Sequence, residues 1–207
     1  MAVRIKICGI TRESDAALAA SLGAEAIGFV FWPGSPRVVS IDDARRILAA
    51  TPGSVVKIGV FVNQPLEEVR STAEALDLDG VQLHGDESDE DMAALPLAII
   101  KAVPLGQPGS EARAIDLPPG VVPLVDVFDP VRRGGTGQTV DWDVAARISA
   151  RRPMMLSGGL TPENVGDAVR KVDPWYVDVS SGVEAAPGIK DEHKLRAFIE
   201  AVRATGM

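Results

Sequence analysis

The stretch PMMLSGGLTPENVGDAVRKVDPWYVDVSSGV, residues 153–183, contains the repeating unit of the fold. A short apolar run at 153–157 precedes a glycine-containing turn, a segment of helical period at 162–172 and a second apolar run at 176–180. Strand, helix and strand in this order are typical of a β-α-β unit, in which the two strands are parallel. The chain is therefore predicted to be α/β.

Similar units fill the whole chain of 207 residues, without a linker or a low-complexity stretch. The predicted strands are 3–8, 26–31, 55–62, 80–84, 98–103, 121–127, 153–157 and 176–180. The predicted helices are 13–22, 41–50, 66–76, 142–150, 162–172 and 191–204. Because residues 106–119 hold Gly, Pro and only a brief helical segment at 110–114, the fifth helix is predicted to be short or missing. We expect one domain over residues 1–207.

Side-chain alternation within the strands favours a closed (β/α)₈ TIM barrel over an open sheet. In the first strand Lys6 and Cys8 share one face, and Ile5 and Ile7 share the other. The same polar and apolar alternation recurs at Gln82, His84, Lys101, Asp126, Ser157, Asp178 and Ser180. The apolar face is predicted to pack on the helices, and the polar face to point into the barrel.

Depth along the barrel axis separates two groups of these polar residues. Ionisable side chains inside a barrel need partners or water, so Lys6, Lys101 and Asp178 are interpreted as an internal ion-paired layer or as substrate contacts. Cys8, His84, Asp126 and Ser180 are at strand ends, where barrel enzymes carry their chemistry.

The composition excludes several classes of partner. A formal net charge of −8 opposes binding to nucleic acid, and the doublet Arg132-Arg133 is too small to form a basic patch. The chain has one cysteine, no apolar run long enough to span a membrane and no signal-peptide core. We therefore expect a cytoplasmic protein that does not bind a membrane.

Two strand-to-helix turns follow the seventh and eighth strands. They carry Gly158 and Gly159 in SGGLTP at 157–162, and Ser180, Ser181 and Gly182 in DVSSGV at 178–183. Backbone N–H groups in such turns hold phosphate in many barrel enzymes, so we expect a phosphate site there. Thr161 followed by Pro162 is predicted to cap the seventh helix. Tight turns without a ligand are the alternative interpretation.

Cys8 and Asp126 are the candidate proton-transfer pair. A helix N-terminus or a cation near Cys8 would lower the pKa of its thiol and make it a general base. Apolar neighbours would raise the pKa of the Asp126 carboxyl and make it an acid. The residues alone leave two alternatives open, namely a small buried side chain for Cys8 and a structural aspartate for Asp126.

The remaining polar motifs are less specific. GGTG at 134–137 is interpreted as a segment that folds over a ligand or as an exposed loop. His84 is a ligand contact or a structural histidine. Because neither His84 nor His193 has neighbours at the spacing of metal ligands, no metal is predicted.

Seven segments resemble those of the phosphoribosylanthranilate isomerase family and follow its order. They are KICGIT at 6–11, GFVF at 28–31 with SPR at 35–37, QLHGDE at 82–87, LVD at 124–126, GGTG at 134–137, SGGLTPEN at 157–164 and VDVSSGVE at 177–184. They are distributed over nearly the whole chain, and together they are highly specific for this family.

The resemblance implies a cofactor-free Amadori rearrangement of N-(5-phosphoribosyl)anthranilate in tryptophan biosynthesis. It implies that Asp126 is the general acid, Cys8 the general base and Arg37 the partner of the anthranilate carboxylate. We also expect His84, Asp178 and Gly135 to contact this small phosphorylated substrate. The expected pH profile is a bell whose acid limb follows Cys8 and whose alkaline limb follows Asp126. The expected assembly is a monomer or a weak homodimer.

Two alternatives compete with this interpretation. One is another phosphate-binding barrel enzyme, similar to thiamine-phosphate synthase, which would need a diphosphate and magnesium site. The other is a barrel that binds phosphorylated metabolites without catalysis. A separate expectation concerns Pro123, which lacks a backbone donor, so pairing of the sixth strand is predicted to begin at Leu124.

Overall fold

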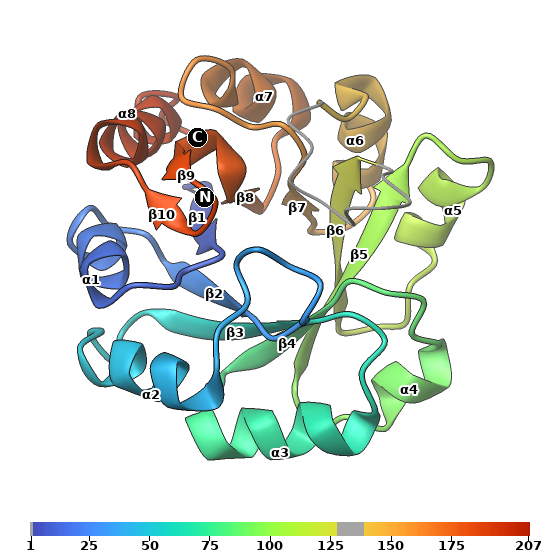
Figure 1. Ribbon diagram of the computed structural model, residues 1–207. Coiled ribbons are helices and arrows are strands. Elements are labelled where there is room, and N and C mark those ends of the chain that lie inside the picture. Colours follow the sequence, from blue (N-terminus) through green and yellow to red (C-terminus); the bar gives the residue numbers. More distant parts are fainter. Residues whose placement is uncertain (1, 128–138) are drawn as a thin grey trace.

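Eight parallel strands close into a barrel that is surrounded by helices (Figure 1). The computed structural model describes residues 2–127 and 139–207. The strands pair in sequence order, and β8 returns to pair with β1, so the barrel is closed. The barrel strands are β1 (Arg4–Cys8), β2 (Ala26–Val30), β3 (Val56–Phe61), β4 (Gly80–Leu83), β5 (Ala98–Leu105), β6 (Val121–Val127), β7 (Met155–Leu156) and β8 (Tyr176–Val179). The predicted α/β barrel is confirmed.

Helices connect successive strands, and most of them match the sequence pattern. The helices are α1 (Glu13–Ser21), α2 (Ile41–Ala49), α3 (Leu66–Leu76), α4 (Asp89–Ala93), α5 (Ser110–Ile115), α6 (Trp142–Ser149), α7 (Val165–Val172) and α8 (Glu192–Arg203). The fifth helix is short, as predicted. The sequence interpretation missed α4, although Ser88 and Asp91 form a capping box at its start. Among the described residues no helix is long and apolar enough to cross a membrane.

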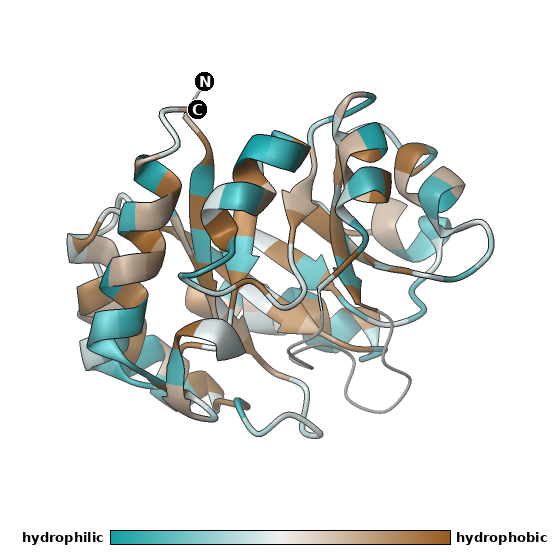
Figure 2. Cartoon of the chain, turned by 90° about the horizontal axis from the view of Figure 1, so that it is seen from above, coloured by the Kyte–Doolittle hydropathy of each residue, from teal (hydrophilic) through white to brown (hydrophobic). Residues whose placement is uncertain are grey.

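The apolar core has two layers, one on each side of the strands. Outward-facing residues such as Ile7 and Val125 pack with the buried faces of the helices. The inner layer consists of Ala26, Ile58, Ile100, Ala102, Leu124, Met155 and Tyr176. Figure 2 shows hydrophobic residues along the strands and a mixture of hydrophobic and hydrophilic residues along the helices. The inner apolar layer closes the barrel below the polar groups at the C-terminal ends of the strands.

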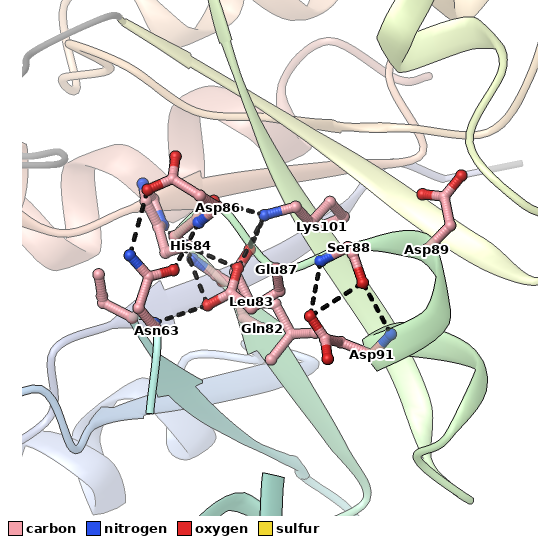
Figure 3. Close-up of polar contacts among 12 residues, drawn as sticks. Asn63, Gln82, Leu83, His84, Asp86, Glu87, Ser88, Asp89, Asp91 and Lys101 are labelled. Carbon is pink, nitrogen blue, oxygen red and sulfur yellow. Dashed lines mark hydrogen bonds and ion pairs between the residues drawn. The ribbon is translucent and has the colours of Figure 1, made fainter. Parts of the chain in front are cut away.

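The face of β5 that was predicted to point into the barrel is wrong, as the position of Lys101 shows. Its strand neighbours Ile100 and Ala102 belong to the inner layer, so Lys101 points outward. Its ammonium lies 2.8 Å from Oε2 of Glu87 and donates to the Gly85 carbonyl at 2.6 Å (Figure 3). Lys101 therefore anchors the loop after β4 and is not part of an ion-paired layer inside the barrel.

Glu87 also joins this loop to the preceding one. Its carboxylate accepts hydrogen bonds from the backbone N–H of Asn63 at 2.8 Å and of Gly85 at 2.9 Å (Figure 3). Glu87 and Lys101 are both buried, so each compensates the charge of the other.

Glu87→Gln is expected to lower the free energy of unfolding by about 2 kcal/mol, because Lys101 then stays buried without a counter-charge. Urea unfolding of the variant beside the parent measures this difference. Glu90→Gln, on the exposed side of α4, is the control and should change stability little. Equal stability of Glu87→Gln and the parent would contradict the anchoring role.

The prediction that pairing of β6 begins at Leu124 is also wrong. Strand pairing begins at Val121, and Pro123 lies in register with Lys101. The Val125 carbonyl accepts a hydrogen bond from the backbone N–H of Ser157, which lies on the β7 side. The backbone nitrogen of Pro123, two residues earlier, therefore faces the same side. Because β7 begins only at Met155, opposite Leu124, Pro123 has no strand beside its nitrogen to which it would need to donate.

Candidate active site

A cavity of about 570 Å³ opens at the C-terminal end of the barrel. Its lining includes six of the predicted site residues, namely Cys8, Arg37, His84, Asp126, Asp178 and Ser180. A cavity of similar volume, about 560 Å³, lies beside α4 and the start of β6, and none of the predicted site residues lines it. Perturbed ionisable groups in a concave site favour the first cavity as the functional one.

Asp126 is the acidic group of this cavity. It is the second-last residue of β6, is 5% exposed and accepts a hydrogen bond from the Val127 backbone N–H at 2.7 Å. Burial raises the pKa of its carboxyl to about 7, although the hydrogen bond from Val127 opposes the shift. Asp126 can therefore hold a proton near neutral pH and give it up, as the sequence interpretation requires of an acid.

Cys8 ends β1, and its environment differs from the predicted one. Burial raises the pKa of its thiol, and the positive charge of Lys6 only partly offsets this effect. The predicted lowering of the thiol pKa is therefore wrong. The physical reason is desolvation, since Cys8 is 7% exposed.

Lys6 and Asp178 form an ion pair at the floor of the cavity. The ammonium lies 2.7 Å from Oδ1 of Asp178 and donates to Oε1 of Gln82 at 2.9 Å. Burial favours the neutral amine, but Asp178 and Cys8 outweigh it and raise the pKa of Lys6. The predicted internal layer is thus present for Lys6 and Asp178, and a cation lies beside the Cys8 thiol.

Arg37 reaches the cavity from the loop after β2 and meets a partner that the sequence interpretation did not foresee. Its Nε and Nη2 donate to the two carboxylate oxygens of Glu184 at 2.8 and 2.7 Å. Glu184 also pairs with Lys190 at 2.9 Å. Glu184 and Lys190 come from the hairpin β9 (Glu184–Ala186) and β10 (Ile189–Lys190), which follows the 3₁₀ turn η1 (Ser181–Val183).

The hairpin also ties the first and last strands together at the cavity. Lys190 is buried, and its ammonium donates to the Cys8 carbonyl at 2.6 Å and to the Ser180 carbonyl at 3.2 Å. Arg37 lines the cavity, and the buried Glu184 and Lys190 lie behind it, so this group holds two basic residues and one carboxylate. Their sum is positive, which favours an anionic ligand.

The two predicted phosphate turns are in contact. A Cβ atom on Gly182 would lie 1.9 Å from the Leu160 carbonyl oxygen, so only glycine fits there. Gly158 and Gly159 have positive φ angles of 84° and 62°. Ser180 presents a buried hydroxyl with no hydrogen-bond partner among the described residues, which is typical of a group that bonds to a ligand.

The start of α7 differs from the prediction. The helix begins at Val165 after Asn164, and not after Thr161. The Asn164 amide accepts from the Thr161 N–H at 2.8 Å and donates to the Gly159 carbonyl at 2.9 Å, so it braces the first phosphate turn. Gly135 and the rest of GGTG lie outside the described residues.

Comparison with known proteins identifies the family. The family model for N-(5'-phosphoribosyl)anthranilate isomerase matches residues 5–201. The chain belongs to the phosphoribosylanthranilate isomerase family. A relative from Pseudomonas paraeruginosa named N-(5'-phosphoribosyl)anthranilate isomerase is 47% identical, with 99% of this chain and 97% of the relative covered.

Solved structures of phosphoribosylanthranilate isomerases are also similar to this chain. The enzyme from Thermotoga maritima has a TM-score of 0.91 and 42% identity, with 98% of this chain and 99% of that chain covered. A second structure, with a TM-score of 0.87, 41% identity and the same coverage, is of the isomerase in complex with reduced 1-(o-carboxyphenylamino)-1-deoxyribulose 5-phosphate.

Three residues of this family member were missed as parts of the site. Gln82 was noted for its parity and as the first residue of a motif, Glu184 only as the last residue of a motif, and Lys190 not at all. A buried carboxylate and a buried lysine near the eighth strand carry no local sequence signal. Arg37, the partner of Glu184, is 147 residues from it in the sequence, so only the closed barrel brings these two side chains together.

Proposed function

We propose that the chain isomerises N-(5-phosphoribosyl)anthranilate to 1-(2-carboxyphenylamino)-1-deoxyribulose 5-phosphate in tryptophan biosynthesis. The observation that carries the proposal is that Cys8 and Asp126 line one cavity, where burial raises the pKa of Asp126 to about 7. An Amadori rearrangement needs an acid for ring opening and a base for enolisation, and these two groups supply both.

The proton steps follow from these two groups. Asp126 gives its proton to the furanose ring oxygen, the C1–O bond breaks, and a Schiff base forms between the sugar and the anthranilate nitrogen. The Cys8 thiolate then takes the proton from C2, and the electron pair of that C–H bond forms the enolamine. The enolamine tautomerises to the ketone. Lys6, whose charge favours the thiolate, lies next to the base.

The remaining cavity residues are proposed to bind the two ends of the substrate. The phosphate takes the backbone donors of Gly158, Gly159, Ser181 and Gly182 and the hydroxyl of Ser180. The anthranilate carboxylate takes Arg37, whose Nε and Nη2 are held by Glu184, so the substrate meets another edge of the guanidinium. His84, Asp178 and Gly135 complete the proposed contacts.

The setting of the enzyme is part of the same proposal. We place it in the cytoplasm as one domain, acting without a cofactor or a metal, as a monomer or a weak homodimer. Its partner is the small phosphorylated substrate, and neither nucleic acid nor a membrane is required.

The test follows the fluorescence of the anthranilate group of the substrate in the presence and in the absence of EDTA. Loss of the substrate signal at the same rate in both is the expected result. Binding of the substrate without turnover would identify a binding protein instead. A requirement for a divalent cation would favour another class of barrel enzyme.

The pH profile of kcat/KM is expected to be a bell whose two limbs belong to the opposite groups from those expected from the sequence. The competent form has Asp126 protonated and Cys8 deprotonated. Asp126 ionises near pH 7, whereas burial moves the Cys8 thiol above its usual pKa. When one proton is shared by the two groups, the competent form has it on Asp126 and is the less populated of the two forms. The acid limb, near pH 7, therefore reports the pKa of Asp126, and the alkaline limb reports the pKa of Cys8.

Thiolate absorbance, measured as the difference between the parent and Cys8→Ser, checks this order independently. Cys8 is the only cysteine, so the difference has no background from other thiols. The expected titration lies above that of a free thiol. A thiolate that forms below pH 7 would restore the assignment made from the sequence.

Gly159→Val is expected to raise KM about tenfold or more and to lower kcat less, because a β-branched residue at positive φ distorts the phosphate turn. Steady-state kinetics separate the two constants. Gly53→Val is the control, since a Cβ atom at Gly53 meets no neighbour within 4 Å. An unchanged KM in Gly159→Val would move the phosphate to another site.

A further inference from the structure

A chain of hydrogen bonds crosses the cavity floor from β1 to the end of β4. The Lys6 ammonium donates to Oε1 of Gln82 at 2.9 Å, and Nε2 of Gln82 lies 2.9 Å from Nδ1 of His84. Lys6 and Gln82 are 0% and 2% exposed, so water does not compete for these contacts. Nε2 of His84 then faces Oδ2 of Asp126 at 3.6 Å.

Lys6 fixes the orientation of the Gln82 amide. An ammonium group has three N–H donors and no acceptor, so the atom of Gln82 that faces it must be the carbonyl oxygen. The other end of the amide, which faces His84, is then the NH₂ group, which can only donate. The ion pair of Lys6 with Asp178, at 2.7 Å, keeps the ammonium in this position.

The oriented amide in turn fixes the proton on His84. Because the Gln82 NH₂ donates to Nδ1, this nitrogen must offer a lone pair, and the proton of the neutral ring is on Nε2. The backbone N–H of His84 donates to the Phe61 carbonyl at 2.8 Å. The next residue, Gly85, is held by Lys101 and Glu87, so the backbone that carries the His84 ring is fixed on both sides (Figure 3).

We propose that Gln82 is a positioning residue that fixes the Nε2–H tautomer of His84, so that His84 presents a hydrogen-bond donor beside Asp126. The assignment of the tautomer rests on the hydrogen bonds alone. Its catalytic consequence rests on the proposed function. When Asp126 gives its proton to the substrate, the adjacent N–H of His84 stabilises the carboxylate that is left, and a histidine with its proton on Nδ1 could not do so.

Nitrogen NMR of the imidazole rings tests the tautomer directly in the parent protein. The chain has two histidines, so a His193→Gln variant assigns both spectra, and His193 on α8 is an internal reference. We expect His84 to show an unprotonated Nδ1 and a protonated Nε2. A proton on Nδ1 of His84 in the parent would overturn the proposal, whatever the activity of the protein.

Gln82→Glu tests the part played by the amide. The carboxylate still pairs with Lys6 but accepts a hydrogen bond from His84, so the proton is expected to move to Nδ1, and kcat is expected to fall about tenfold with a smaller change in KM. Gln107→Glu introduces the same change at an exposed position and should leave both readouts unchanged. An unaltered His84 spectrum in folded Gln82→Glu would overturn the proposal.

The two readouts separate this inference from the proposed function. A parent protein with Nε2–H on His84 but no turnover of the substrate would contradict the proposed function and support the tautomer assignment. Turnover with Nδ1–H on His84 would do the reverse. If Gln82→Glu does not fold, the spectrum of the parent still decides.

Discussion

Cys8→Ser is expected to lower kcat by about 10²-fold or more, because a serine hydroxyl is far harder to ionise than a thiol. The difference persists although burial raises the pKa of the Cys8 thiol, since the same burial acts on the hydroxyl. Steady-state turnover of the purified variant beside the parent measures the loss.

Binding should survive this change. The proposed phosphate and carboxylate contacts are made by other residues, so Cys8→Ser should bind a product analogue within a few-fold of the affinity of the parent. Cys8 also holds Lys190 through its backbone carbonyl, and the serine variant keeps that contact. Weakened binding together with a small loss of kcat would instead indicate a structural role for Cys8.

Asp126→Asn is expected to stabilise the fold at alkaline pH. Burial moves the pKa of this carboxyl from 3.8 to about 7, so the folded state binds the proton more tightly than the unfolded state. The parent therefore loses stability as the pH rises from about 4 to about 7. Above that range the cost is about 4 kcal/mol, which an uncharged asparagine does not incur.

Urea unfolding at about pH 5 and about pH 8 measures this effect. The stability advantage of Asp126→Asn over the parent should grow by about 3 kcal/mol between the two pH values. Asp116→Asn, at an exposed aspartate, is the control and should show no such growth. An advantage that is the same at both pH values would mean that Asp126 ionises normally.

The fold could be predicted from the sequence because its signals are local. Alternation of Lys6 and Cys8 with Ile5 and Ile7 reports which face of a strand is apolar, and eight such strand–helix units favour closure into a barrel. The pattern failed at Lys101, since an outward-facing lysine with a buried partner has the same alternation as an inward-facing one. The inner-layer neighbours Ile100 and Ala102, and the register with the outward-facing Leu83, show its direction.

The site was predictable for its strand-end residues and not for their partners. Cys8, His84 and Asp126 lie at or next to the C-terminal ends of their strands, so one topological rule brings them to one cavity. Glu184 contacts Arg37, Lys190 contacts the Cys8 carbonyl and Gln82 contacts Lys6. These partners are distant in the sequence, and nothing in the neighbouring residues indicates the contacts. The pKa of Cys8 was misjudged because the sequence shows the nearby charge of Lys6 but not the depth of burial.

Single-turnover conversion of the substrate by excess protein tests the central claim, that Cys8 and Asp126 transfer the protons. The loss of substrate fluorescence is followed for the parent, Cys8→Ser and Asp126→Asn, so product release does not limit the observed rate. Both variants are predicted to convert the bound substrate about 10²-fold or more slowly than the parent. Conversion by either variant at the rate of the parent would contradict the account.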